Sequence, residues 1–305
     1  MKKDHDLYNE IKGLTTEQRN PRTAGIDLAP AEEIVRLINA EDRLVADAVG
    51  GALADIARVV ELVVASFKQG GRLLYFGAGT SGRLGVIDAS ECPPTFGVDP
   101  GMVVGVIAGG RETVFLSREG IEDDLEGGER DVAAHKVSSR DTVVGIAASR
   151  RTPYVLGALA AARSIGASTA MVRCNEGPRP EVDAVVTVVP GPEVITGSTR
   201  MKAGSAQKMV LNMITTASMV RLGKVYENLM VDLRPNSRKL IERGKGIVME
   251  LAGLGYPEAE AMYEASGRDV KVAVVMARRG LDRSEAQTEL ARADGFLARA
   301  LGERS

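Results

Sequence analysis

Tryptophan is absent from this chain of 305 residues, and aromatic residues make up only 4% of it. Proteins that hold single-stranded nucleic acid stack the bases on aromatic side chains, so the composition argues against that class. Basic and acidic residues nearly balance, which leaves a formal net charge of −2. No general attraction to nucleic acid or to an anionic membrane surface follows from that charge. We therefore expect neither a nucleic acid nor a membrane as a partner.

Cysteine and histidine are also scarce. Cys92 and Cys174 are not spaced as a metal pair or a redox pair, which is typical of a reduced, cytoplasmic protein. His5 and His135 are too few for a multi-histidine site, so we expect no metal. The first residues lack the apolar region of a signal peptide, and no apolar run approaches the length of a membrane span.

Apolar runs typical of buried strands alternate with helical patterns through the middle of the chain. Continuous Val/Ile/Leu runs such as VVGVIA and TVVGIA indicate parallel strands that are buried on both faces. The sequence therefore predicts an α/β fold with a doubly wound parallel sheet and helices on both faces. The expected strands are 72–76, 102–107, 142–147, 168–172 and 184–189, and the expected helices are about 81–89, 124–135 and 153–165.

Helical patterns flank this region on both sides. The periodicity predicts helices over 30–39, 41–68 and 197–222, and then about 236–251, 257–265, 268–279 and 284–301 with no strand among them. We therefore divide the chain into an N-terminal helical segment (1–60), a sheet domain (61–235) and a small all-helical module (236–305).

A glycine-rich turn follows the first expected strand. Gly79, Thr80, Ser81 and Gly82 stand where a helix begins, and the free N–H groups and dipole of a helix start favour an anion. The letters also fit the GxGxxG dinucleotide fingerprint, which requires an acid at the end of the second strand. The sequence has Gly-Gly-Arg there, so we predict a phosphate site and no cofactor.

A second hydroxyl-rich turn follows the third expected strand. Ser149 and Thr152 precede Pro153, which suits the first turn of a helix. An isolated Ser or Thr at such a place is usually a helix cap. Two such turns at the carboxyl edge of one parallel sheet instead predict a ligand site, because open α/β folds bind ligands there.

The longer strings that contain these turns resemble one family. GAGTSGRLGVIDASECPPTFG, GSTRMKAGSAQKMVLNM, GKVYENLMVD and the N-terminal LTTEQRNPRTAGIDLAPAEEIVRLINAED are similar to the N-acetylmuramic acid 6-phosphate etherases, which are built on the sugar isomerase (SIS) domain. The resemblance covers nearly the whole chain, and it implies a phosphosugar substrate and a UBA-like C-terminal domain. One position departs from the family pattern: Arg150 replaces a glycine, so its side chain must point away from the phosphate site or add charge to it.

The resemblance also implies the reaction and two acids. The family cleaves the D-lactyl ether at C3 of N-acetylmuramic acid 6-phosphate to give N-acetylglucosamine 6-phosphate and D-lactate. By the motifs DASECPP and EGIEDD, Glu91 protonates the leaving lactate, and Glu122 either removes the C2 proton or activates water. Glu91 precedes Cys92-Pro93-Pro94, where partial burial would raise its pKa. Glu122 lies in an acidic run that without the resemblance would be interpreted as a solvated helix start.

Two other functions compete with this one. A phosphosugar-sensing regulator on the same fold would bind the sugar without releasing lactate, and an aldose–ketose isomerase would need no acid aimed at C3. We also expect a homodimer, from the resemblance and from the methionine-rich helix around 201–220. A complete site then takes residues from both subunits, since SIS-type pockets lie near such an interface.

Overall fold

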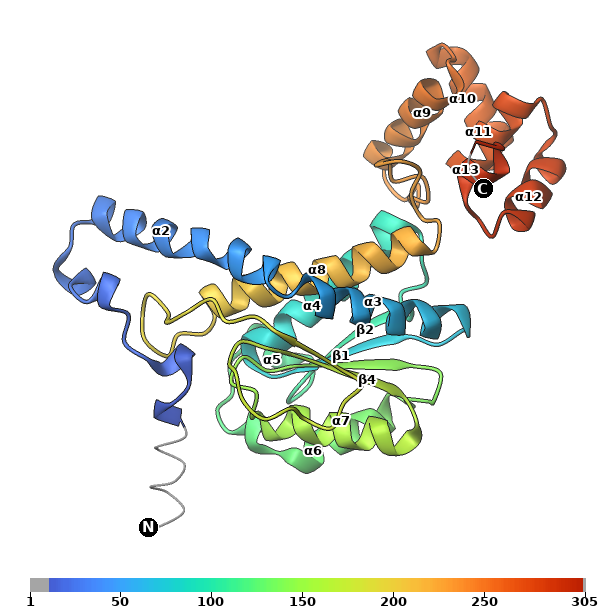
Figure 1. Ribbon diagram of the computed structural model, residues 1–305. Helices are drawn as coiled ribbons and strands as arrows, with labels where there is room; N and C mark the ends of the chain where they lie inside the picture. Colours follow the sequence, from blue (N-terminus) through green and yellow to red (C-terminus); the bar gives the residue numbers. More distant parts are fainter. Residues whose placement is uncertain (1–10, 304–305) are drawn as a thin grey trace. The chain divides into compact units, whose positions relative to one another are not determined.

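The computed structural model describes residues 11–303, which contacts divide into two compact units (Figure 1). The first comprises the chain up to Ser90 together with Gly101–Thr215. The second comprises Glu91–Pro100 and the chain from Thr216 onward. Each unit has its own buried core and is described separately below. The finer division at residues 60 and 235 stays a prediction.

The first unit contains the predicted parallel sheet. Its strands are β1 (Leu73–Gly77), β2 (Val103–Ile107), β3 (Thr142–Ile146), β4 (Ser168–Arg173) and β5 (Ala184–Thr187). Their order is β2-β1-β3-β4-β5, and every neighbouring pair is parallel. The expected strands are confirmed to within two residues at their ends, because continuous apolar runs between turn residues leave little freedom for another interpretation.

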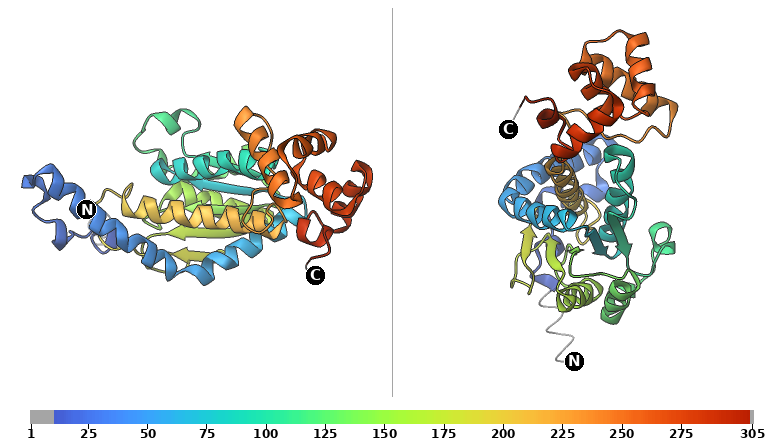
Figure 2. Two further views of the ribbon diagram at one scale, coloured as in Figure 1. Left: turned by 90° about the horizontal axis from the view of Figure 1, so that it is seen from above. Right: turned by 90° about the vertical axis from the view of Figure 1, so that its right-hand side faces the viewer.

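Helices cover both faces of this sheet (Figures 1 and 2). Helix α3 (Leu53–Lys68) packs on one face, and α7 (Pro153–Ile165) packs on the other with α6 (Leu125–Ala134) beside it. Side chains along β1 alternate accordingly. Leu74 and Phe76 enter the core that contains Tyr154 of α7, whereas the Tyr75 hydroxyl donates to Asp88 of α4 (Gly79–Phe96) at 3.0 Å.

The strand order creates a switch point between β1 and β3. From β1 the chain first adds β2 on one side and then crosses to add β3 on the other side. In open α/β sheets the crevice for ligands lies outside the carboxyl ends of the strands at such a point. The two hydroxyl-rich turns follow these two neighbouring strands, so the fold places them together.

Four helices before residue 222 differ in their bounds from the sequence prediction. The N-terminal helices are α2 (Ala31–Gly50) and α3, so the break falls at the glycine pair 50–51 and not near residue 40. Helix α4 continues through Pro93 and Pro94 to Phe96, although prolines usually interrupt helices. Helix α8 (Lys202–Arg221) begins five residues after Gly197, because the Glu193 carboxylate accepts the backbone N–H groups of Lys202 and Ala203 at 2.8 and 2.9 Å.

Short elements lie between these helices and strands. They are η1 (Thr15–Glu17), η2 (Pro21–Thr23), η3 (Ile26–Leu28), α5 (Glu112–Phe115) and η4 (Ile121–Asp123). The sequence predicted an irregular start to the chain, and the short 3₁₀ turns from residue 15 to 28 fit that description. Among the helices of the described residues, none combines the length and the apolar character that crossing a membrane requires.

The second unit is helical apart from an isolated bridge between Tyr226 and Leu229. Polar side chains fix the starts of its helices: Ser237, Asp269 and Asp282 each accept a backbone N–H in the first turn. The helix predicted over 284–301 is broken by Asp294 and Gly295, which both have positive φ. The helices are α9 (Arg238–Ala252), α10 (Tyr256–Ala265), α11 (Val270–Arg279), α12 (Arg283–Arg292) and α13 (Leu297–Ala300).

Candidate active site

A cavity of about 350 Å³ opens in the first unit at the carboxyl ends of β1 and β3. Six of the eight residues predicted for the site line it: Gly79, Thr80, Ser81, Glu122, Ser149 and Thr152. The cavity brings both hydroxyl-rich turns and one of the two predicted acids together. Gly82 and Glu91 are not among the lining residues.

Two glycines shape the first turn for different reasons: Gly79 for its backbone conformation and Gly82 for its close contact with the sheet. Gly79 has φ +53 and no atom within 4 Å of where a Cβ would stand, so it is required for backbone conformation. At Gly82 an added Cβ would lie 2.6 Å from the Gly77 carbonyl oxygen. Gly82 therefore lets α4 start close against the sheet, which directs the first N–H groups of the helix at the cavity.

Ser81 is fixed from outside the turn. Its hydroxyl donates to Oε1 of Gln207 on α8 at 2.9 Å, and Gln207 is buried. The Ser81 oxygen keeps acceptor capacity toward the cavity. Helix α8 thus takes part in the phosphate turn, which the local sequence around Ser81 does not reveal.

The second turn leaves a hydroxyl available. Thr152 stands at the N-cap of α7, yet its side chain makes no capping hydrogen bond within the part of the chain that the structure describes. Ser149 Oγ accepts the backbone N–H of Arg151 at 3.3 Å and so shapes the turn. The capping alternative is therefore wrong for Thr152, which lines the cavity.

Arg150 points away from the cavity. Its backbone keeps φ at +63, a value that glycine adopts without cost and that strains other residues. Its Nε lies 2.5 Å from the position of a Cβ on Gly177, so the guanidinium packs against that glycine's backbone. Of the two alternatives for this departure from the family pattern, the structure shows the first, and the side chain is not among the cavity-lining residues.

Glu122 reaches the cavity from the short helix η4. Gly120, at φ +80, reverses the chain just before it. The neighbouring Ile121 packs over Gly109, where an added Cβ would lie 2.8 Å from the Ile121 Cδ1 atom. The loop that carries the acid is thus held against the end of β2 by a glycine contact that admits no larger side chain.

Arg83 ties this loop to the phosphate turn. It lies in the first turn of α4 and donates to the backbone oxygens of Val114 and Thr113, each at 2.8 Å, and to Ser117 Oγ at 3.2 Å. A planar guanidinium satisfies three such acceptors with one side chain. Phosphate turn and acid loop are therefore positioned by the same helix.

We expect Arg83→Ala to lower kcat about 10- to 100-fold, because the acid loop loses its anchor and small misplacements of reacting groups are costly. Arg83→Lys keeps the charge, but a single ammonium cannot donate to all three acceptors at once. We therefore expect its kcat to fall almost as far. Steady-state kinetics of both variants check this. Near-normal kcat in Arg83→Lys would mean that Arg83 acts through its charge alone.

Glu91 lies elsewhere. It is inside α4 and exposed, so the expected partial burial beside the prolines is wrong for the single chain. The sequence indicated a loop after a short helix, because a Pro-Pro pair normally ends one. Its assigned role as the acid that protonates lactate stays a prediction.

The sequence analysis missed the wall supplied by the N-terminal segment. Glu17 lines the cavity, together with Glu119 and Thr199. The neighbouring Thr16 is pinned by Asn175: its N–H donates to Oδ1 at 3.3 Å and its Oγ1 accepts Nδ2 at 3.0 Å. The only signal for Glu17 is its place in the family-like string LTTEQRN, which gives no role to an individual residue.

A buried ion cluster holds the same segment to the start of α8. Lys202, which is fully buried, donates to Glu41 Oε2 at 2.7 Å and to the Pro192 oxygen at 3.0 Å. Arg22 forms a two-pronged contact with the same carboxylate. Hydrogen bonds from Arg22 and Lys202 lower the pKa of Glu41 from its ordinary 4.5 to about 2. The cluster holds the chain on both sides of Thr199 and, through Arg22, just after Glu17.

Comparisons with known proteins agree with this architecture. Residues 55–163 match the family described as the glucokinase regulatory protein N-terminal SIS domain. N-acetylmuramic acid 6-phosphate etherase 2 of Vibrio cholerae is 52% identical over 97% of this chain and 97% of its own length. The etherase of Clostridium beijerinckii is 49% identical over 96% of this chain and 97% of its own, and that of Salinibacter ruber is 52% identical over 99% and 98%.

Solved structures align more distantly. The phosphoheptose isomerase GmhA from Neisseria gonorrhoeae is 17% identical and covers 61% of this chain and 97% of its own, with a TM-score of 0.45. The assignment rests on the curated relatives, which are about half identical from end to end. The chain belongs to the N-acetylmuramic acid 6-phosphate etherase family.

Proposed function

We propose that this protein cleaves the D-lactyl ether of N-acetylmuramic acid 6-phosphate, giving N-acetylglucosamine 6-phosphate and D-lactate. The relatives that carry this activity in their names match nearly the full chain. The observation that carries the proposal is the cavity, in which helix-start amides, small hydroxyls and Glu122 line one space. Such a site suits a sugar whose phosphate is held at the turns while its carbon chain lies near a carboxylate.

The chemistry explains why carboxylates are needed. Opening the sugar ring exposes an aldehyde at C1, which acidifies the C2 proton. A carboxylate removes that proton, the C3–O bond breaks, and an acid delivers a proton to the departing lactate oxygen. Water then adds its oxygen to C3 of the unsaturated aldehyde, and C2 regains a proton. Atoms balance without oxidation or reduction.

We assign Glu122 to C2 deprotonation or to activation of water, and Glu91 to protonation of lactate. Glu122 has the geometric support, since it lines the cavity. Glu91 has the motif support but does not line the cavity, and we propose that another copy of the chain supplies it. We therefore also propose a homodimer with sites that combine residues of two subunits.

Product analysis in isotopically heavy water tests the function. Elimination followed by addition leaves deuterium at C2 of N-acetylglucosamine 6-phosphate and solvent oxygen at C3, with one D-lactate per sugar. Tight binding of the substrate without D-lactate would favour the phosphosugar-sensing regulator. Exchange of the C2 proton with solvent without release of D-lactate would favour the isomerase.

A further inference from the structure

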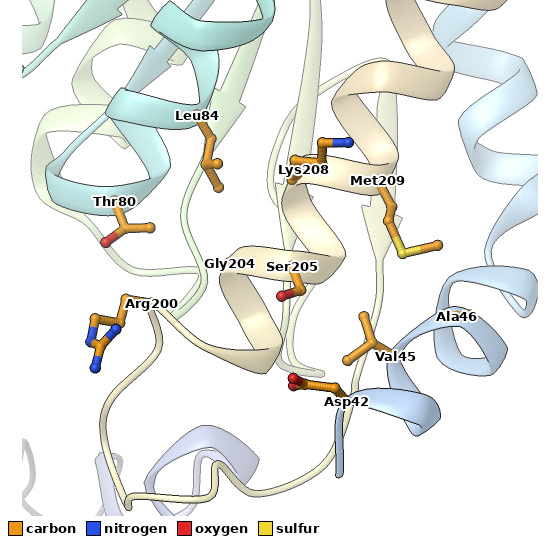
Figure 3. Close-up of a pocket in the computed structure, with 10 residues that line it drawn as sticks. All are labelled: Asp42, Val45, Ala46, Thr80, Leu84, Arg200, Gly204, Ser205, Lys208 and Met209. Carbon is orange, nitrogen blue, oxygen red and sulfur yellow. The ribbon is translucent and has the colours of Figure 1, made fainter. Parts of the chain in front are cut away.

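A second cavity of about 390 Å³ lies in the same unit, between α2, the first turns of α4 and the start of α8 (Figure 3). It adjoins the first cavity at Thr80, which lines both. Of the adjacent residues Thr199 and Arg200, the first lines the first cavity and the second lines the second cavity. The two spaces therefore share a wall made of Thr80 and this loop.

Thr80 presents a different group to each side. Its methyl group lies 3.5 Å from the Cβ position of Gly204, at the start of α8. In Figure 3 that methyl points toward the middle of the second cavity and the hydroxyl points away from it. The residue that offers a hydroxyl at the phosphate turn thus offers an apolar contact to the second cavity.

The second cavity combines an apolar lining with positive charge. Val45 of α2, Leu84 of α4 and Met209 of α8 contribute large apolar side chains, and Arg200 lies beside Thr80. Lys208 adds a second cation, against the single acid Asp42. This chemistry suits a small group that carries both a methyl and a carboxylate.

The first cavity is unfavourable for such a group, because its lining carries negative charge. Three carboxylates line it: Glu17, Glu119 and Glu122. Its arginines are already engaged, because Arg83 holds the acid loop and Arg118 pairs with Glu112. A second carboxylate on the ligand, besides the phosphate, would meet like charge there, which disfavours its ionised form.

We propose that the second cavity receives the lactyl group of the substrate, with Arg200 pairing its carboxylate and Val45, Leu84 and Met209 contacting its methyl. The inference rests on the proposed function and assigns a subsite within it. Arg200 suits the task because a guanidinium binds a carboxylate through two parallel hydrogen bonds. It also adjoins Thr199, which lines the first cavity.

Arg200→Leu tests the subsite, with two ligands that differ only by the lactyl group. The KM for N-acetylmuramic acid 6-phosphate should rise about 10- to 100-fold, as expected for the loss of a charge-assisted hydrogen bond. Inhibition by N-acetylglucosamine 6-phosphate, which lacks the lactyl group, should change by less than about threefold. Arg200→Lys should recover part of the loss, and Lys208→Leu should have a smaller effect than Arg200→Leu.

Equal loss for both ligands would overturn the proposal, because Arg200 would then serve the phosphate or the fold. An unchanged KM would overturn it as well. Arg58→Leu, on the exposed surface of α3 outside both cavities, is the matched charge control. If Arg200→Leu does not fold, Arg200→Gln gives the same comparison. D-lactate release by the wild type is measured first, so failure of the proposed function is distinguished from failure of this subsite.

Discussion

Replacing Glu122 or Glu91 by glutamine is expected to slow D-lactate release by about 10²- to 10⁴-fold in each case, the range that general acid–base groups supply. Glutamine keeps the size of the side chain but neither takes nor gives the proton. Affinity for the substrate should persist, since the phosphate turns are untouched. Glu122→Gln should also block exchange of the C2 proton with solvent if Glu122 is the base at that carbon.

Mixing the two inactive variants distinguishes the sources of the acids. If a site pairs Glu122 of one subunit with Glu91 of the other, each mixed dimer has one intact site, and random mixing restores about a quarter of wild-type activity. If both acids come from one chain, mixing restores none. Glu126→Gln, an exposed acid at the start of α6 outside the cavity, is the matched control. Near-normal turnover by Glu91→Gln would remove that residue from the mechanism.

The sheet and the phosphate turns could be predicted from the sequence because their signals are local. A continuous apolar run such as Leu73–Phe76, followed by Gly-x-Gly-Thr-Ser-Gly, specifies a buried strand and a helix start within a dozen residues. The site residues at these turns follow from strand order, since parallel strands end at one edge. The family-like strings added Glu122, which no local signal separates from its acidic neighbours.

The remaining features depend on contacts between distant segments. Glu17 lines the cavity only because Thr16 bonds to Asn175, which follows β4. Helix α8 starts at Lys202 only because Glu193 accepts its first N–H groups. Glu91 was expected in a loop because proline interrupts an isolated helix, whereas in this fold α4 continues past it. The hydrophobic periodicity of the sequence cannot predict the place of Glu17, the start of α8 or the length of α4, since tertiary packing decides each of them.

Glu41→Gln is expected to lower the free energy of unfolding by about 3–5 kcal/mol, because it leaves the buried Lys202 ammonium without its counter-charge. The side chains of Lys202 and Glu41 are 0% and 3% exposed, so water cannot replace the lost partner. Urea unfolding near neutral pH measures the change. Removing both charges, in Glu41→Leu with Lys202→Met, should recover part of the loss, since the buried ammonium is gone and Glu193 keeps its two backbone hydrogen bonds.

Glu33→Gln provides the control, because Glu33 lies on the same helix and pairs with Arg36 at the surface. Exposed pairs contribute little, so this variant should unfold almost like the wild type. A small effect of Glu41→Gln, comparable with that of Glu33→Gln, would contradict the prediction. A double variant as unstable as the single one would show that packing at this site matters more than charge.

The same cluster predicts a loss of stability in acid. Because the pKa of Glu41 falls from 4.5 to about 2 on folding, its contribution is fully present above pH 4.5 and disappears as the pH falls toward 2. Wild type and Glu41→Gln should therefore converge in stability over that interval. Burial raises the pKa of Glu193, which acts in the opposite direction in both proteins. The difference in free energy of unfolding between the two proteins therefore reports the contribution of Glu41 alone.

The bond between Thr16 and Asn175 has a consequence for how the enzyme is made. The segment around Glu17 is synthesised before the groups that anchor it, since Asn175 follows Thr16 by 159 residues and Lys202 follows Glu41 by 161 residues. A nascent chain that has completed only β1, β2 and β3 thus has phosphate turns but an unfinished wall. The cavity wall is therefore completed only after Lys202 has been synthesised, and until then the nascent chain should bind no sugar tightly.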